Sequence, residues 1–216
     1  MKVVEIFTSI EGEGRRVGEF STFIRLFGCN LNCSYCDTPY GKDKEYEGEA
    51  KEMSIDEIVS EVCSRGVTNV TLTGGEPLIH GDIKELINLL CDHGFEVNVE
   101  TNGTIVPPVR RKSVFYTIDF KTDASGMSDK MNLDVYDALG GGDVIKCVVG
   151  SIDDIVQSLE FLKKYKHILP IVYFSPVFGK IEPAEIVDFL KDNRIYDYRV
   201  QVQLHKVIWN KDKRGV

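Results

Sequence analysis

The chain of 216 residues has no apolar run close to the roughly 20 residues that a membrane-spanning helix requires. It has no excess of positive charge either, because 34 Asp and Glu face 26 Lys and Arg and the formal net charge is −8. Since Lys and Arg neutralise phosphates, a broad nucleic-acid-binding surface is not expected. Met1–Glu5 lacks the apolar core and cleavage site of a signal peptide, so we expect a cytoplasmic protein.

Low-complexity segments, long linkers and internal repeats are absent as well, and this predicts a single domain over residues 1–216. Short β-type runs alternate with helical patterns, which is typical of an α/β fold with a buried, mostly parallel sheet. The expected strands are Ser21–Phe27, Asn69–Thr73, Phe95–Glu100, Val114–Asp119, Val144–Val149, Ile171–Ser175 and Arg199–Leu204.

Apolar stripes with helical spacing predict four helices. They cover Asp56–Arg65, Ile83–His93, the residues after Ser151 to about Leu162, and Pro183–Arg194, with no full-length helix between Val114 and Val149. The first begins with the capping box Ser54-x-x-Glu57 and carries Cys63 on its apolar stripe, so we expect Cys63 in the core. Gly94 follows the second helix as its C-terminal cap.

Cysteine is scarce, with six in the chain, but three of them lie close together. Cys29, Cys33 and Cys36 have C-x3-C-x2-C spacing, and no fourth cysteine follows before Cys63. A [4Fe–4S] cluster normally takes four cysteine ligands, so this spacing predicts a cluster with one open iron. The alternatives are a structural zinc site with a distant ligand such as His80, or a set of buried thiols. The remaining cysteines are expected to be free thiols: Cys63, Cys91 and Cys147.

Two further motifs follow predicted strands, as the cysteine loop does. Thr73–Pro77 contains paired glycines, which let the backbone approach a ligand closely, and Glu100–Gly103 follows the next strand. The C-terminal ends of parallel strands meet at one edge of a sheet, where ligands bind. Plain turns are the alternative interpretation of both motifs.

The cysteine spacing, with Tyr35 before the last cysteine, and the Gly-Gly-Glu-Pro and Glu-Thr-Asn-Gly motifs resemble the signature of the radical S-adenosylmethionine superfamily. The resemblance implies a shortened (β/α) partial barrel. It also implies that S-adenosylmethionine binds the open iron and that the Gly-Gly-Glu-Pro element receives its amino group.

Four other segments resemble a narrower family, the 7-carboxy-7-deazaguanine synthases: Ser9–Gly14, Phe23–Arg25, Asp37-Thr38 and Leu204–Lys206. This resemblance implies conversion of 6-carboxy-5,6,7,8-tetrahydropterin to 7-carboxy-7-deazaguanine, a precursor of deazapurines such as queuosine, with ring contraction and loss of ammonia. It also implies a homodimer, a flavodoxin or ferredoxin as electron donor, and a Mg²⁺ ion.

The same resemblance implies roles for residues of this chain. They are substrate binding by Ile10, Glu11, Gly12, Arg25 and Thr73, S-adenosylmethionine binding by Tyr35, Asp37, Gly75, Glu100, Lys121 and Ser175, Mg²⁺ binding by Thr38, and cluster binding by Cys29, Cys33 and Cys36. The planar donor fork of Arg25 suits the substrate carboxylate, and an ordinary strand-surface ion pair is its alternative. The hydroxyl oxygen of Thr38 suits Mg²⁺, and a turn-capping role is its alternative.

The chain also departs from the family pattern. Glu11 stands where the family commonly has Gln, and an ionised Glu only accepts hydrogen bonds whereas a Gln also donates them. Asp119-Phe120 replaces Ser-Pro ahead of Lys121, Ser175-Pro176 replaces Gln-Pro, and Asn210–Val216 extends the chain where many relatives end in a substrate-contacting proline.

Two other functions share some of these features. An activating enzyme of a glycyl-radical enzyme would have the same cysteine spacing, but it would act on a protein and would not need Ile10–Gly14, Arg25 and Thr38. A non-enzymatic zinc-binding module would be distinguished by metal analysis alone.

Overall fold

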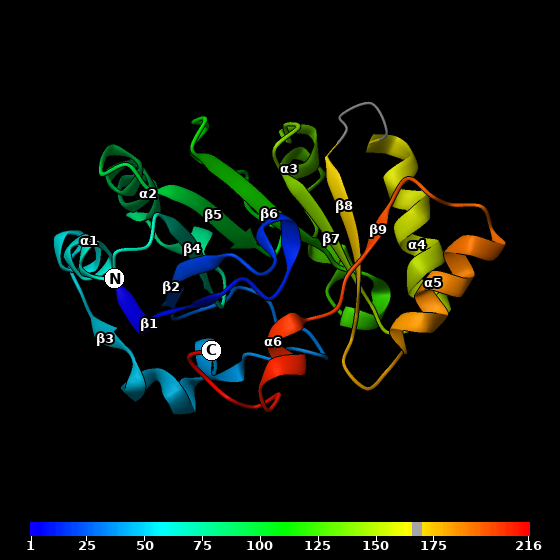
Figure 1. Cartoon of the computed structure of the whole chain (residues 1–216), viewed down its shortest axis with the longest axis horizontal. Coiled ribbons are helices and arrows are strands. Elements are labelled where there is room, and N and C mark those ends of the chain that lie inside the picture. Colours follow the sequence, from blue (N-terminus) through cyan, green and yellow to red (C-terminus); the bar gives the residue numbers. More distant parts are fainter. Residues whose placement is uncertain (166–169) are drawn as a thin grey trace.

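The computed structural model describes residues 1–165 and 170–216 (Figure 1). In this part of the chain nine strands form one open sheet, in the order β3-β1-β2-β4-β5-β6-β7-β8-β9. β1 is antiparallel to β2 and β3, and each neighbouring pair from β2 to β9 is parallel. The strands are β1 (Lys2–Ile10), β2 (Phe20–Leu26), β3 (Lys51–Glu52), β4 (Asn69–Gly74), β5 (Glu96–Thr101), β6 (Val114–Phe120), β7 (Val144–Val149), β8 (Ile171–Pro176) and β9 (Arg199–Val200). The predicted α/β fold with mostly parallel strands is confirmed, and the sheet does not close into a full barrel.

The longer helices pack as two groups along the sheet (Figure 1). One group is α1 and α2, with α2 against β5, and the other is α4 and α5, which pack on β7 and β8. The helices are α1 (Ile55–Ser64), α2 (Ile83–Asp92), α3 (Leu133–Asp137), α4 (Ile152–Leu162), α5 (Pro183–Asp192) and α6 (Leu204–Ile208). In the described part of the chain, none of them combines the length and apolarity that crossing a bilayer requires.

Residues along the parallel strands alternate between two faces. On the side that meets the helices, the strands bury apolar side chains in one continuous core, among them Val70, Leu72, Val97, Val99, Ile118 and Ile145. The intervening residues form a second set, here called the polar face: Thr71, Thr73, Asn98, Glu100, Asp119 and Lys146. The strand register sets Asp119 directly beside Lys146. One face of each strand therefore builds the core, and the other presents polar groups.

The predicted elements agree with the observed ones except at the sheet edges. Six of the seven predicted strands and all four predicted helices are present, with ends within two residues. The strand predicted over Arg199–Leu204 is wrong in extent, because β9 ends at Val200 and Leu204 already begins α6. The edge strand β3 and its neighbour β1 are not predicted at all. The five-residue α3 agrees with the prediction of no full-length helix between β6 and β7.

Helix ends follow the capping signals in the sequence. The Ser54 hydroxyl accepts a hydrogen bond from the backbone N–H of Glu57 at 3.2 Å, and the Glu57 carboxylate accepts one from the backbone N–H of Ser54 at 2.8 Å. The predicted capping box is therefore confirmed. Gly94 takes the left-handed conformation, with φ of 87°, that ends α2 as predicted.

The predicted burial of Cys63 is wrong. Its thiol is exposed, and Sγ lies 3.9 Å from Nδ1 of His93 at the end of α2. The buried stripe of α1 is formed by Ile58, Val59 and Val62. Cys63 lies in the last turn of α1, next to that stripe, and is exposed to solvent.

Candidate active site

A cavity of about 530 Å³ lies at the C-terminal ends of the parallel strands, against the polar face. Every residue to which the sequence assigns a binding role contributes to its lining: Ile10, Glu11, Gly12, Arg25, Cys29, Cys33, Tyr35, Cys36, Asp37, Thr38, Thr73, Gly75, Glu100, Lys121 and Ser175. The parallel strand order brings these residues together although they span most of the sequence. The cavity is large enough for small organic ligands.

The cysteine loop leaves β2 and forms one wall of the cavity. Cys29 and Cys33 are half-buried and Cys36 is exposed. Burial raises the pKa of both half-buried thiols, although the ammonium of Lys121 acts in the opposite direction on Cys33. The backbone N–H of Leu31 lies 3.4 Å from Sγ of Cys29, and Asn102 Nδ2 lies 3.8 Å from the same sulfur. These donors are of the kind that stabilise cluster-bound thiolates, so the loop fits an iron–sulfur cluster.

In the described residues, no three His, Cys, Asp or Glu side chains converge on one point where they could hold a single metal ion. A cubane cluster does not require such convergence, because its cysteine ligands bind separate iron atoms. His80, the distant ligand considered for zinc, is not among the described residues that line the cavity.

The paired glycines join the end of β4 to the cysteine loop. Gly74 has φ of 142°, and a Cβ atom there would lie 2.0 Å from the carbonyl oxygen of Leu26. A Cβ atom at Gly75 would lie 2.1 Å from the carbonyl oxygen of Gly28. Only glycine permits this approach, which places the Gly75 backbone on the cavity wall beside Cys29.

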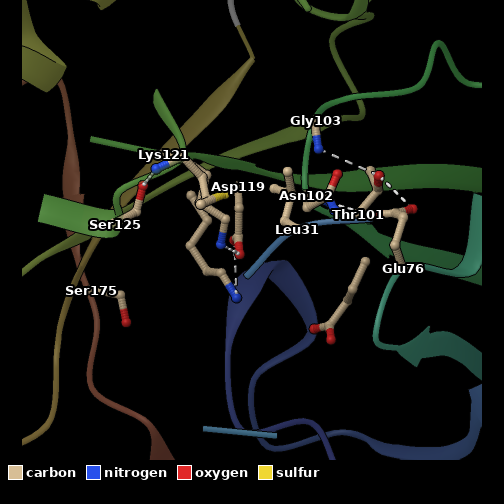
Figure 2. Close-up of polar contacts among 12 residues, drawn as sticks. Leu31, Glu76, Thr101, Asn102, Gly103, Asp119, Lys121, Ser125 and Ser175 are labelled. Atoms are coloured by element: carbon tan, nitrogen blue, oxygen red, sulfur yellow. Dashed lines mark hydrogen bonds and ion pairs between the residues drawn. The ribbon is translucent and has the colours of Figure 1, made fainter. Parts of the chain in front are cut away.

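Glu76 connects the two glycine-containing motifs behind the cavity (Figure 2). Its carboxylate accepts hydrogen bonds from the hydroxyl of Thr101 at 2.9 Å and from the backbone N–H groups of Leu78 and Asn102 at 2.9 and 2.6 Å. Burial raises its pKa to about 7, against the opposing effect of these donors. Both oxygens of Glu76 are thus engaged within the protein. Thr73, Gly74 and Gly75 line the cavity, whereas Glu76 is not among the lining residues.

A buried charge network forms the floor of the cavity. Asp119 Oδ2 accepts from Lys121 Nζ at 2.8 Å, and the ammonium of Lys146 lies 3.1 Å from Glu13 and 3.2 Å from Asp119 (Figure 2 shows the first pair). The hydroxyl of Ser175 donates to Glu13 at 3.2 Å. Burial alone would lower the pKa of Lys121, but the adjacent Asp119 outweighs it and raises that pKa. Both lysines therefore stay charged below the cavity.

The sequence assigns no role to Glu13 or Lys146, although both line the cavity. A single Lys between apolar residues in a strand, as in Val144–Val149, is the signal that predicts a buried ion pair at this point.

The departure from the family pattern at Asp119-Phe120 has a structural consequence as well. Asp119 is the group that pairs with both lysines, so this acid fixes Lys121 in the cavity.

Arg25 reaches the cavity from the end of β2. Its Nε donates to Glu5 at 2.8 Å, and both side chains are partly buried. Its guanidinium carbon lies 5.4 Å from the ring centre of Tyr40 and 5.9 Å from that of Phe7. The strand ion pair considered as an alternative is therefore present. Because only Nε makes that bond in the described residues, the two terminal nitrogens can bind a carboxylate as well.

Thr38 and Asp37 follow the cysteine loop and line the same cavity as Arg25. The Thr38 hydroxyl donates to Oδ1 of Asp37 at 3.1 Å, and Oδ2 of Asp37 accepts from Lys206 Nζ at 2.9 Å. Burial would raise the pKa of Asp37, but Lys206 outweighs it and lowers that pKa. A donating hydroxyl still has lone pairs, so the oxygen of Thr38 can bind a cation.

The C-terminal segment covers part of the cavity. The backbone N–H of Leu204 donates to the carbonyl of Gly12 at 2.9 Å, and a Cβ atom at Gly12 would lie 2.0 Å from Nδ1 of His205. Further along, the guanidinium of Arg214 lies 3.9 Å from the ring centre of Tyr40 and pairs with Glu49 at 2.8 Å. The segment Asn210–Val216 thus folds back, and Lys211, Lys213, Gly215 and Val216 line the cavity.

A cavity at the strand ends of an open α/β sheet, with three cysteines in the loop after β2, indicates the class of protein. Residues 23–192 match the model of the Radical SAM superfamily, and the chain belongs to that superfamily. The chain is 44% identical to the 7-carboxy-7-deazaguanine synthase of Clostridium acetobutylicum, covering all of this chain and 99% of that protein. It is 35% identical to the 7-carboxy-7-deazaguanine synthase of Methanospirillum hungatei, covering 96% and 85% of the two chains. Within the superfamily, this chain belongs to the 7-carboxy-7-deazaguanine synthase family.

Solved structures agree on the fold. The crystal structure of QueE from Escherichia coli superimposes with a TM-score of 0.77 at 24% sequence identity, covering 94% of this chain and 93% of the other. The crystal structure of Streptococcus suis SuiB bound to the precursor peptide SuiA superimposes with a TM-score of 0.57 at 15% identity, over 83% of this chain and 48% of SuiB. At these identities the likeness is one of fold.

Proposed function

We propose that this protein is a radical S-adenosylmethionine enzyme that converts 6-carboxy-5,6,7,8-tetrahydropterin to 7-carboxy-7-deazaguanine, with ring contraction and loss of ammonia, in deazapurine biosynthesis of the queuosine type. The observation that carries the proposal is the 44% identity over the whole chain to a relative of that name. It is supported by the cavity, because the cysteine loop, the paired glycines and Arg25 all contribute to the lining of one cavity.

Cys29, Cys33 and Cys36 would hold the [4Fe–4S] cluster. When bound, the cluster and S-adenosylmethionine supply the electron and the organic radical that remove a hydrogen atom from the pterin. The protein's own residues would bind the cluster, S-adenosylmethionine and the substrate, orient them, and shield them from water. Leu31 and Asn102 direct N–H groups at Cys29, and the charged Lys121 lies near Cys33. These groups favour thiolates over thiols.

Around S-adenosylmethionine we place the backbone of Gly75 and five side chains that line the cavity: Tyr35, Asp37, Glu100, Lys121 and Ser175. Most of these side chains are already held in place. Glu100 accepts from Thr73, and Ser175 donates to Glu13. Such fixed groups lose little freedom when the cofactor binds, which favours affinity.

For the substrate, we propose that the terminal nitrogens of Arg25 bind the carboxylate. A Mg²⁺ ion held by the oxygen of Thr38 would contact the same carboxylate, because hard cations prefer oxygen ligands and often take few from protein. Ile10, Gly12 and Thr73 line the space between these groups and the strand ends. The C-terminal segment would limit the access of water to this space.

We further propose one domain, a homodimer, a cytoplasmic location, and a small electron-transfer protein such as a flavodoxin or ferredoxin as reductant. The proposed domain is supported by the single core cluster in the described residues. Exposed apolar side chains on and around α6, among them Val202, Val207 and Ile208, support an interface on that side.

Anaerobic turnover tests the proposal. The reconstituted protein is reduced in the presence of S-adenosylmethionine, with and without the carboxy-tetrahydropterin, and both 5′-deoxyadenosine and 7-carboxy-7-deazaguanine are measured. We expect the deazaguanine product only when the pterin is present. If 5′-deoxyadenosine forms slowly and at a rate that added pterin does not change, the substrate assignment is wrong. A glycyl-radical activating function would then be the alternative to test.

A further inference from the structure

Glu11 is a buried carboxyl group at the end of β1, with 2% of its surface exposed. Its Oε1 accepts a hydrogen bond from the hydroxyl of Thr71. Thr71 is in turn 3.1 Å from the hydroxyl of Ser21, and both hydroxyls are fully buried. The side chain also lines the cavity. Glu11 is therefore fixed from behind by hydroxyl groups while it faces the proposed substrate.

No cation within 4 Å pairs with Glu11 among the described residues. Arg16 (in the 3-10 helix Gly14–Arg16) is the nearest candidate, but its Nη2 pairs with Glu96 at 2.8 Å and its guanidinium lies 4.7 Å from the ring centre of Phe115. Lys146 from β7 is bound to Glu13 and Asp119. A carboxylate without a partner is costly to bury, so the neutral form of Glu11 is favoured.

A second carboxyl group lines the same cavity. Glu100 from β5 is buried and accepts from Thr73 at 2.9 Å, and its negative charge opposes ionisation of Glu11. Burial and then Glu100 raise the pKa of Glu11 to about 8, whereas Thr71 and Arg16 act in the opposite direction. The other charged or titratable groups around this pair are Glu13, Asp119, Lys146 and, from α6, His205. Burial and the charge of Glu100 thus both favour the protonated form of Glu11.

We propose that Glu11 is a specificity-determining residue that binds the substrate as a neutral carboxylic acid, donating one hydrogen bond and accepting another. This inference rests on the proposed function. In this proposal the Thr71 hydroxyl donates to Oε1, and the acid proton is assigned to Oε2. A pterin edge offers N–H donors beside a carbonyl acceptor, so a group that both donates and accepts matches it. A neutral Glu11 therefore does what a glutamine amide does, and the expectation of an acceptor-only Glu11 is replaced.

The protonation state of Glu11 should have a measurable effect on substrate binding. Above the pKa of Glu11 its carboxylate would meet the carbonyl of the pterin without a hydrogen between them. Binding should then weaken on the order of tenfold to a hundredfold, the effect of one unsatisfied hydrogen bond in a buried site. Glu11→Gln keeps a donor and an acceptor at every pH, so its binding should not fall as the pH passes about 8.

The first experiment measures the protonation of Glu11 in the reconstituted protein without substrate. Infrared difference spectra across pH should show a protonated carboxylic acid that disappears as the pH rises through about 8, above the Glu76 pKa of about 7, and Glu11→Gln should lack this band. Glu19→Gln, at an exposed position on the same β1–β2 connection, is the matched control and should retain it. Glu100→Gln removes the neighbouring charge, so the band should titrate at lower pH. A wild-type spectrum with Glu11 ionised at neutral pH would overturn the proposal.

The second experiment measures equilibrium binding of the carboxy-tetrahydropterin to the same anaerobic proteins. Wild type and Glu19→Gln should lose affinity as the pH rises through about 8, and Glu11→Gln should bind about equally on both sides. Glu11→Gln that follows the wild-type profile would contradict a role for the Glu11 proton. If the pterin binds wild type at no pH, the substrate assignment and the specificity role both fail, and the infrared band still decides the protonation separately.

Discussion

The two faces of the parallel strands differ although they share one backbone. On the apolar face, Leu72 and Val99 are fully buried against the helices. One residue further along the same strands, Thr73 and Glu100 line the cavity and hydrogen-bond to each other. A strand alternates its side chains with a period of two, so a single strand can supply the core with one set and the site with the other. Stability and chemistry are thus separated by one residue rather than by separate domains.

The separation of the polar face from the apolar face explains how the site can hold several charged groups. Lys121 is buried and Lys146, Glu13 and Asp119 are largely buried, but these two cations and two anions compensate one another. Burying paired charges costs less than burying single ones. The polar face can therefore be reactive while the apolar face keeps the sheet folded, and substitutions on the two faces should have different effects.

The largest effect is expected in the cysteine loop. Replacing Cys33 with Ala should remove the iron content of the anaerobically reconstituted protein and abolish cleavage of S-adenosylmethionine, because a cluster cannot be held by the two remaining thiolates. Cys63→Ala is the matched control, since Cys63 is exposed and lies away from the cavity, and it should keep both. Iron analysis and 5′-deoxyadenosine formation measure the outcome. A Cys33→Ala protein with full iron content would contradict the assignment.

Neighbouring substitutions in β4 compare the two faces directly. Leu72→Ala should lower the free energy of unfolding by about 2–5 kcal/mol, because it removes buried methyl groups and leaves a cavity in the core. Thr73→Ala loses one hydrogen bond to Glu100 and should cost only about 1–2 kcal/mol, while it lowers turnover. Urea unfolding and turnover of the folded protein give both values. Equal stability losses at the two positions would contradict the division of the strand.

Arg25→Ala tests the carboxylate-binding end of the cavity. The variant should weaken substrate binding by about 2–5 kcal/mol, because a buried carboxylate would lose its charged partner. Arg111→Ala serves as the control, since Arg111 pairs with Asp92 at 2.7 Å on the surface. Binding is measured anaerobically for both variants. Unchanged affinity in Arg25→Ala would leave Arg25 with only its structural role beside Glu5.

The pH dependence of stability compares a buried carboxyl with an exposed one. The pKa of Glu11 rises from 4.5 to about 8 on folding, so between these values the folded state binds more protons and stability falls as the pH rises. Glu11→Gln removes this contribution, and its decline in stability over that range should be shallower by a few kcal/mol. Urea unfolding at several pH values provides the measurement, with Glu19→Gln as control. Parallel curves for Glu11→Gln and wild type would show that Glu11 has no raised pKa.

The smallest effect is expected at Thr38. Removing its oxygen with Thr38→Ala, or chelating divalent cations, should slow product formation on the order of tenfold, since one Mg²⁺ ligand is lost while waters and the substrate carboxylate remain. Iron content should not change. Thr22→Ala, at a buried threonine outside the cavity lining, controls for general effects of losing a hydroxyl. If neither treatment changes turnover, Mg²⁺ has no role in product formation.

Much of the fold follows from the sequence, because local patterns determine it. The parallel strands show as short apolar runs between helices, and the Ser54 capping box marks the start of α1. The sequence does not predict β1, since Lys2–Ile10 mixes polar and apolar residues. The exposure of Cys63 does not follow from periodicity, because a helical stripe does not show which of its residues the neighbouring elements cover.

Some features of the site can likewise be predicted from the sequence, and others cannot. Motif residues such as Cys29 and Gly75 could be placed together because they follow parallel strands. The partners of charged residues could not be predicted, since the contact between Glu13 and Lys146 joins positions far apart in the sequence. The engagement of both Glu76 oxygens, and the burial of Glu11 without a cation, likewise depend on tertiary packing.

We infer that the polar face and the cysteine loop together form one site for cluster, S-adenosylmethionine and pterin. The most direct test is a crystal structure of the anaerobically reconstituted protein with S-adenosylmethionine and the carboxy-tetrahydropterin. We expect a four-iron cluster on Cys29, Cys33 and Cys36, with the pterin between Arg25 and Glu11. A zinc ion on these cysteines, or a pterin bound outside the cavity, would contradict it.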